Sequence, residues 1–375
     1  MAGQGMEKSS KTARDYKARR LRLFVVVVII VIAVLIAAGS LIRGCPLTPW
    51  DRDDRSSIIR YPYGSEQFSL FIKNSCDECG EGSDEEFYSW FEGLYARWRD
   101  DSVNAGAFPF GAFEKYDFRD FLKKSDIHFA SISDETKRGE EQLRCAAGVH
   151  HLVKAVIPKF SLERGFEFVN VMKYGERQCF LQSVLIAGIL QEMGLDAGVV
   201  MVYRNERGEE SNNGHALVLL KLSDAFDVTV DASEKTPFAC HRGLFCKTGT
   251  SYRYYNPIYE GPDRIITAYR TTSGVPVAPR EVLSCDVPFL MSMFYFYRGE
   301  WAPGGLRNGK KSPEGLELAA SYFSRAIKEC GENPLPVYYA ARVSEARGLK
   351  KQAQVYYRQA FSLYNHYGWV PKGLR

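Results

Sequence analysis

The sequence lacks a strong excess of charge of either sign. Its 375 residues include 49 Lys and Arg, 45 Asp and Glu and six His, which gives a formal net charge of +4. Residues 1–22 hold seven basic and two acidic residues, and Arg43 adds one positive charge, so residues 44–375 carry a net charge of −2. Proteins that bind nucleic acid usually present a basic patch or stripe. We therefore expect no nucleic-acid partner.

Charge is also absent from residues 23–42, LFVVVVIIVIAVLIAAGSLI. As a helix with a rise of about 1.5 Å per residue, this run would span roughly 30 Å, the thickness of a bilayer's hydrocarbon core. The basic residues before it favour a cytoplasmic N-terminus. The sequence thus predicts a single-pass membrane protein: a cytoplasmic tail at 1–22, a transmembrane helix at 23–42 in the lipid bilayer, a tether at 43–65 and an extracytoplasmic main body. A lipid-modified Cys45 is the alternative anchor.

Cysteine occurs at nine positions, an odd number. In an oxidising compartment most cysteines pair, so we expect disulfides with one thiol left over. That count is consistent with a free Cys179. The pairs Cys76/Cys79 and Cys240/Cys246 could suggest zinc, but the second spacing does not suit a zinc knuckle. We expect neither a metal nor a cofactor.

The stretch KYGERQCFLQSVLIAGILQEMG places Cys179 at the start of an apolar helix that ends at Gly194. Three runs rich in β-forming residues follow: VVMVYR at 199–204, HALVLLKL at 215–222 and FDVTVDAS at 226–233. The last two are separated by only three residues, which indicates antiparallel pairing. The sequence therefore predicts an α+β fold in which the Cys-bearing helix packs on an antiparallel sheet.

Three residues in these elements form a chemically consistent set: Cys179, His215 and Asp231. Unpaired N–H groups and the helix dipole stabilise a thiolate in the first turn of a helix. If the last two strands pair so that residue i faces residue 448 − i, His215 comes within two positions of Asp231. His215 would then take the thiol proton, and Asp231 would orient the imidazole. Asp227, four residues earlier, is the alternative acid.

The order of these motifs resembles the transglutaminase-like superfamily, whose members share a papain-type Cys-His-Asp core. The resemblance covers roughly residues 140–235. It rests on Gly175 and Cys179, on Met193-Gly194-Leu195-Asp196-Ala197-Gly198 after the helix, on His215-Ala216 and on Val230-Asp231-Ala232-Ser233. It implies a papain/transglutaminase-like domain over residues 66–300, with Cys179 as nucleophile, His215 as base and Asp231 as the orienting acid.

The activity implied is attack on a peptide or amide bond through a thioester intermediate, followed by hydrolysis or transamidation. The backbone N–H of Cys179, helped by Gln178, is expected to bind the oxyanion. A peptide or protein of the cell envelope would be the substrate. Leu217 and Gly198 depart from the aromatic residue and the arginine of the family pattern. The alternative is therefore a catalytically silent scaffold or peptide-binding protein.

Near the C-terminus, five residues recur with an offset of 34. They are Ala319, Tyr322, Phe323, Ala326 and Ile327, repeated as Ala353, Tyr356, Tyr357, Ala360 and Phe361. This period resembles the tetratricopeptide repeat and predicts a helical repeat segment over residues 313–367. So short a segment cannot bury a core alone, so we expect it to pack on the main body or on a protein partner.

Overall fold

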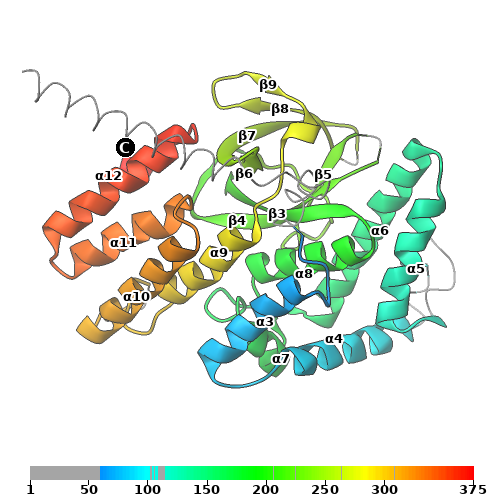
Figure 1. Cartoon of the computed structure of the whole chain (residues 1–375), viewed down its shortest axis with the longest axis horizontal. Helices are drawn as coiled ribbons and strands as arrows, with labels where there is room; N and C mark the ends of the chain where they lie inside the picture. Colours follow the sequence, from blue (N-terminus) through cyan, green and yellow to red (C-terminus); the bar gives the residue numbers. More distant parts are fainter. Residues whose placement is uncertain are drawn as a thin grey trace, which may run out of the picture. The chain divides into compact units, whose positions relative to one another are not determined.

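The computed structural model describes most of the chain after residue 59. The described residues are 60–101, 104, 106–108, 115–205, 207–223, 225–262, 264–307 and 309–375. They belong to one compact unit, Ile58–Arg375 (Figure 1).

The structure corrects the membrane prediction. No helix in the described ranges is long and apolar enough to cross a membrane. This finding contradicts our prediction of a single-pass protein with an extracytoplasmic body, and we withdraw it. The tail predicted at 1–22 and the span predicted at 23–42 lie outside the described residues, as does almost all of the tether.

The disulfide prediction is also wrong for the described cysteines. None of the eight takes part in a disulfide. Six of the eight are buried, and two of these thiols contact other groups: that of Cys145 lies 3.8 Å from Met193 Sδ, and that of Cys285 lies 3.7 Å from the carbonyl oxygen of Phe245. Cys45 lies outside the described residues.

Five helices precede the site helix. They are α3 (Glu66–Cys79), α4 (Asp84–Arg99), α5 (Phe118–Ser131), α6 (Glu135–Val156) and α7 (Phe168–Tyr174). Ser65 caps α3 by accepting a hydrogen bond from the Phe68 N–H, and Gly80 ends that helix with a φ of 70° that favours glycine. Short strands β1 (Lys159–Phe160) and β2 (Glu176–Arg177) pair in parallel on either side of α7.

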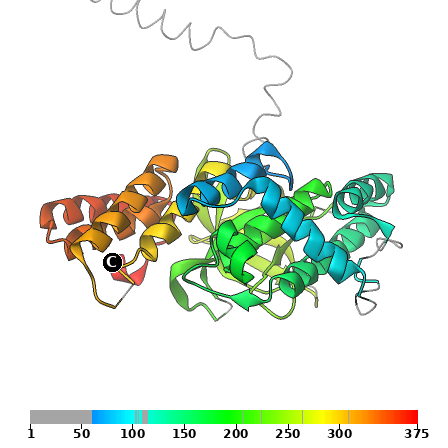
Figure 2. The same cartoon turned by 90° about the horizontal axis from the view of Figure 1, so that it is seen from below.

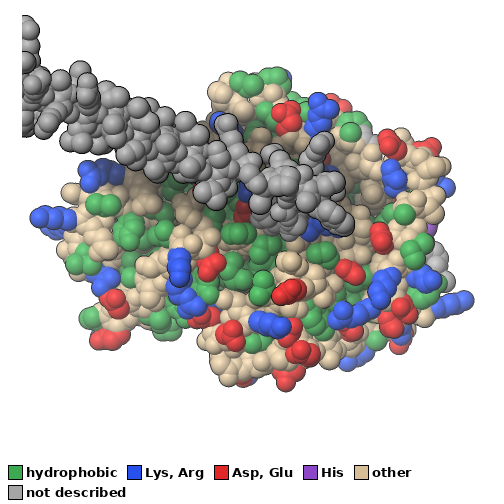
Figure 3. Space-filling model, in the orientation of Figure 1, with side chains coloured by type: hydrophobic (Ala, Val, Ile, Leu, Met, Phe, Trp, Pro, Cys, Tyr) green, Lys and Arg blue, Asp and Glu red, His purple; other side chains and the backbone are tan. Residues whose placement is uncertain are grey.

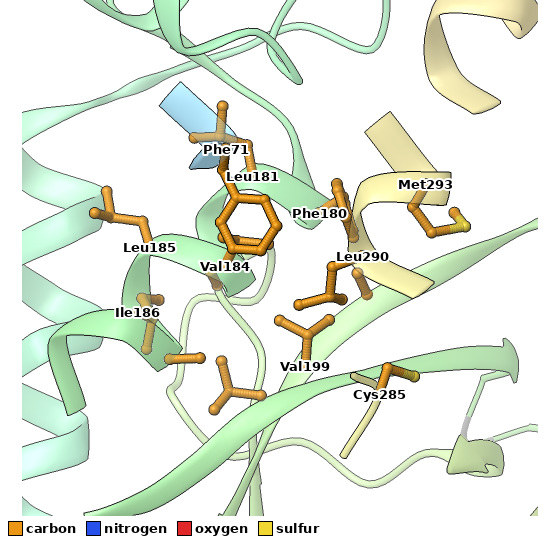
Figure 4. Packing of buried hydrophobic residues seen from close by; sticks show 14 of the residues in the cluster. Phe71, Phe180, Leu181, Val184, Leu185, Ile186, Val199, Cys285, Leu290 and Met293 are labelled. Carbon is orange, nitrogen blue, oxygen red and sulfur yellow. The ribbon is translucent and has the colours of Figure 1, made fainter. Parts of the chain in front are cut away.

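Helix α8 (Cys179–Glu192) is buried on all sides rather than on one face. Every residue from Cys179 to Gln191 is buried. The sequence is apolar around the whole helix, which is typical of a helix inside a core. Figure 4 shows Phe180 and Leu181 of this helix among Phe71 of α3, Val199 and Leu290.

The strands after α8 form an antiparallel sheet that closes on itself. They are β3 (Asp196–Arg204), β4 (Glu210–Lys221), β5 (Asp227–Val230), β6 (Arg242–Thr248), β7 (Ser251–Glu260), β8 (Ile265–Thr271) and β9 (Pro276–Val277). Their order is β5-β4-β3-β6-β7-β8, and Asp227 of β5 pairs with Ile266 of β8, which closes a six-stranded barrel. Strand β9 adds to β8 outside the closed circuit.

The closed barrel corrects our fold prediction. The structure is α+β, but its sheet closes into a barrel with α8 packed on the outer face of β3 and β4, which is not the papain/transglutaminase-like arrangement that we predicted. Strands β6 to β8 come from a region in which we recognised no strands, and β8 covers the edge of β5. Closure of this kind leaves no unpaired strand edges.

The barrel has two packed faces. Its interior holds residues from five strands and one loop: Val200, Val202, Leu217, Leu219, Leu244, Cys246, Tyr255, Ile266, Tyr269 and Val282. The alternate residues Val199 and Met201 of β3 face outward and join the cluster that contains α8. This alternation explains why β3 and β4 are almost continuously apolar.

The C-terminal helices pack beside the barrel (Figures 1 and 2). They are α9 (Val287–Glu300), α10 (Pro313–Glu329), α11 (Pro334–Ala346) and α12 (Lys350–His366), with short 3-10 turns η4 (Pro279–Glu281) and η5 (Lys372–Leu374). The ring of Trp369 lies 5.4 Å from that of Tyr203 in β3, and the Tyr254 N–H bonds to the Tyr367 carbonyl at 3.1 Å. On the face drawn in Figure 3, basic and acidic side chains are interspersed.

Candidate functional site

The site begins at the N-terminal end of α8. Gln178 is the residue before the helix, with extended backbone angles and no side-chain cap. Its N–H bonds to the Gly165 carbonyl at 2.8 Å, and a Cβ at Gly165 would overlap the backbone of Arg177. This close contact fixes the turn that leads into Cys179, which is 8% exposed. Because no side chain caps the helix, its first N–H groups remain available to an anion.

His215 lies in β4 opposite Val202 of β3, and its side chain is 25% exposed. Its Nε2 atom is 2.8 Å from Asp231 Oδ2, and the thiol of Cys179 lies beside its ring. Burial lowers the pKa of His215, but Asp231 and the neighbouring Cys179 thiol outweigh burial and raise this pKa well above its ordinary value. With Nε2 engaged by Asp231, Nδ1 is the ring nitrogen left for the thiol.

Asp231 follows β5 and is almost completely buried, with a side-chain exposure of 1%. Oδ2 accepts hydrogen bonds from two imidazoles, His215 at 2.8 Å and His241 at 2.9 Å, and Oδ1 accepts the Ser233 N–H at 2.9 Å. Burial raises the pKa of Asp231, but the bonds from both histidines outweigh it and hold this pKa well below the usual range. The carboxyl group is therefore ionised.

The barrel topology explains why these residues meet. The pairs Val218–Val230 and Lys221–Asp227 confirm the predicted register, in which paired residue numbers sum to 448. The chain leaves β5 at Asp231 and turns back beside that strand, where Phe238 pairs with Val230, before it reaches β6 past Tyr259 of β7. Asp231 at the end of β5, His215 in β4 and His241 just before β6 therefore share one end of the barrel.

The alternative acid, Asp227, lies at the other end of β5. Its carboxylate accepts the Tyr269 hydroxyl at 2.6 Å and lies 3.4 Å from Lys221 Nζ. Burial raises its pKa to about 6. It does not reach His215, so the geometry brings Asp231, not Asp227, to the imidazole.

Gln178 and Gln182 are buried polar residues near the thiol. Gln178 Nε2 makes one long bond of 3.4 Å to the Leu162 carbonyl, and its Oε1 has no hydrogen-bond partner in the described ranges. Gln182, one turn after Cys179, is fully buried, and neither of its amide atoms finds a partner in those ranges. The sequence pointed to Gln178 but gave no sign of Gln182.

Two histidines of the site were missed from the sequence. His241 donates to Asp231, and His150 of α6 is buried with Nε2 3.1 Å from the Asp231 carbonyl oxygen. Burial, with help from Lys154, lowers the pKa of His150 to about 4. Both segments lacked a motif, so only the fold reveals them.

The same atoms could hold a metal ion. Ligand atoms of His215, Asp231 and His241 lie within 4.8 Å of one another, a set that suits zinc. A metal on His241 Nε2 would move the ring proton to Nδ1, which is buried and has no partner among the described residues. Metal-bound histidines usually donate their second N–H to a partner. The arrangement therefore fits a hydrogen-bonded acid–imidazole network better than a metal centre.

Comparison of the sequence with models of known protein families and with curated proteins finds no match.

Proposed function

We propose that this chain is a thiol-dependent acyl-transfer enzyme with Cys179 as the nucleophile. The observation that carries the proposal is the position of His215, which lies beside the thiol of Cys179 and bonds to the buried carboxylate of Asp231. A neutral thiol is a weak nucleophile, and an adjacent base activates it. This is the role that a transglutaminase-like relationship would give these residues.

In the proposed reaction, His215 takes the proton of Cys179, and the ionised Asp231 stabilises the imidazolium. The thiolate attacks the carbonyl carbon of a peptide or other amide. Backbone N–H groups in the first turn of α8, which no side chain caps, stabilise the oxyanion. His215 then protonates the leaving amine, and the acyl group remains on sulfur as a thioester. Water or a second amine attacks the thioester, giving hydrolysis or transamidation.

The proposal is tested by alkylating the full-length chain with iodoacetamide at several pH values and measuring each modified cysteine by peptide mass spectrometry. We expect Cys179 to react rapidly at pH 6 and to slow in the His215→Ala variant. Cys79 is an internal control. The residue as a whole is exposed. Its thiol group is partly buried, and this burial, together with the nearby Glu167, raises the pKa of the thiol to about 11. It should react only in alkaline solution in both proteins.

A second measurement reports acyl transfer itself. Mixed with p-nitrophenyl acetate, the wild-type chain should release a burst of nitrophenolate and gain one acetyl group on Cys179, whereas Cys179→Ala should do neither. A Cys179 labelling midpoint near the free-thiol value of about 8.5, unchanged by His215→Ala, would contradict the proposal. It would favour the catalytically silent, peptide-binding alternative.

A further inference from the structure

Asp231 binds two imidazoles through one oxygen atom, and the proposed reaction uses only one of them. Nε2 of His215 and Nε2 of His241 lie 2.8 and 2.9 Å from Asp231 Oδ2. The two rings are 5.6 Å apart between centroids and inclined at 47°. The His241 side chain is 10% exposed, against 25% for His215. His241 is therefore the inner of the two donors.

The protein holds the backbone of His241 from two directions. The Tyr259 hydroxyl on β7 accepts the His241 N–H at 2.9 Å and lies 3.1 Å from the His241 carbonyl oxygen, to which it donates. The residues before His241 run beside β5, where the Asp231 N–H bonds to the Pro237 carbonyl at 2.8 Å. The Thr229 hydroxyl also donates to the Ala239 carbonyl at 2.8 Å. His241 is thus tied to the strand that carries the acid.

The environment of the His241 ring fixes which nitrogen carries the shared proton. Nε2 faces a carboxylate oxygen, which only accepts hydrogen bonds, so Nε2 donates. Nδ1 is buried and has no partner in the described part of the chain. A buried N–H without an acceptor is costly, so Nδ1 carries no proton. His241 therefore donates one hydrogen bond, from Nε2 to Asp231.

We propose that His241 is a positioning residue of the site: it fixes the Asp231 carboxylate toward His215 and takes up part of its negative charge. This inference rests on the proposed function. Without His241, Oδ2 would give its whole charge to His215, and the carboxylate would be free to rotate about the bond that leads to it. The larger negative charge on Oδ2 would make the His215 imidazolium harder to deprotonate. The freely rotating carboxylate would orient the His215 ring less well.

Other titratable groups surround the pair. They are Cys179 on α8, His150 and Lys154 on α6, Tyr259 on β7, Arg177 before α8 and Glu234 after β5. None of them donates a side-chain hydrogen bond to the Asp231 carboxylate in the described ranges. Replacing His241 therefore removes one of only two side-chain donors to that carboxylate.

The test uses the full-length chain and the pH profile of Cys179 alkylation. The rate of Cys179 alkylation should rise again at alkaline pH, and we call this second rise the alkaline step. It marks the loss of the His215 proton, because a thiolate that is no longer paired with the imidazolium is more nucleophilic. His241→Leu removes the donor, and His241→Gln keeps an amide N–H near the position of Nε2. We expect the alkaline step to rise by about one pH unit in His241→Leu, the size of effect of one hydrogen bond to a carboxylate. In His241→Gln it should stay close to the wild-type value.

The outcomes are separable. An unchanged alkaline step in folded His241→Leu, or equal shifts in the Leu and Gln variants, would overturn the role of His241 and leave the proposed function standing. If the wild-type chain itself shows no rapid labelling near pH 6, the proposed function fails first. If His241→Leu does not fold, Tyr259→Phe is the second test. It removes the hydroxyl that holds the His241 backbone and leaves the Asp231 side chain unchanged. The alkaline step should then rise in Tyr259→Phe as well, and an unchanged step would overturn the role of His241.

Discussion

Asp231 accepts hydrogen bonds from His215, His241 and the Ser233 N–H while its side chain is only 1% exposed. Asp231→Asn keeps the shape of the side chain but removes its charge and one of its two acceptor atoms. Breaking a buried charged pair by removing one partner typically costs about 3–5 kcal/mol. We therefore expect the free energy of unfolding to fall by about that amount near pH 6, measured by urea denaturation.

The pH dependence of this loss follows from the direction of each shift. The pKa of Asp231 is lowered in the folded state, so its contribution is fully present above its unfolded value of about 3.9 and is lost as the pH falls. The pKa of His215 is raised, so its contribution is fully present below about 6.5 and is lost as the pH rises. The difference between wild type and Asp231→Asn should thus be largest between about pH 4 and pH 6.5.

Asp227→Asn is the matched control on the same strand. Burial raises the pKa of Asp227 to about 6, so this carboxyl group stabilises the fold more as it becomes protonated. Its difference from wild type should grow between pH 6 and about pH 4, whereas that of Asp231→Asn should stay nearly constant there. A loss below about 1 kcal/mol for Asp231→Asn, or parallel pH trends in the two variants, would refute this reasoning.

Three further predictions concern the surroundings of the site. Gly165→Ala should lower the free energy of unfolding by about 1–3 kcal/mol in urea denaturation, because its Cβ would overlap the Arg177 backbone; an unchanged midpoint would contradict this. His150 has a pKa lowered to about 4, so the wild type should lose stability from about pH 6.5 toward pH 4; thermal melts of His150→Leu should lack that loss. Dialysis against EDTA should leave the melting temperature and the rate of Cys179 alkylation unchanged; a fall in either that added zinc reverses would place a metal on the His215–Asp231–His241 trio.

The sequence predicted the structure well where the apolar pattern was clear and where the motifs followed one another closely along the chain. The apolar helix, the two strands around the 223–225 turn and their register followed from local patterns, and the register brought His215 to the acid at the end of β5. The strand that carries His215 begins earlier than the run that we predicted at 215–222: β4 starts at Glu210. Just before it, the Asn205 N–H bonds to the Glu209 carbonyl.

The barrel and His241 could not be predicted because their signals are non-local. Strands β6 to β8 mix Tyr, Arg, Pro and Gly, and they are strands because they pair with one another and, at the two ends of the set, with β3 and β5. His241 precedes β6 in a segment with no periodicity, and its partner lies ten residues earlier across the end of the barrel. Without the turn that brings Phe238 back beside Val230 of β5, nothing in the sequence relates His241 to Asp231.

The network separates the residue that holds the site together from the residue that performs the chemistry. The Asp231 carboxylate accepts hydrogen bonds from His215, His241 and the Ser233 N–H, so Asp231→Asn removes the charged acceptor of these buried donors. His215 has one carboxylate partner and is partly exposed, so water can replace some of its contacts. His215→Ala should therefore destabilise the fold less than Asp231→Asn, yet slow Cys179 alkylation at pH 6 at least as much. The opposite ranking of stabilities in urea denaturation would mean that the imidazole, not the carboxylate, is the anchor of the site.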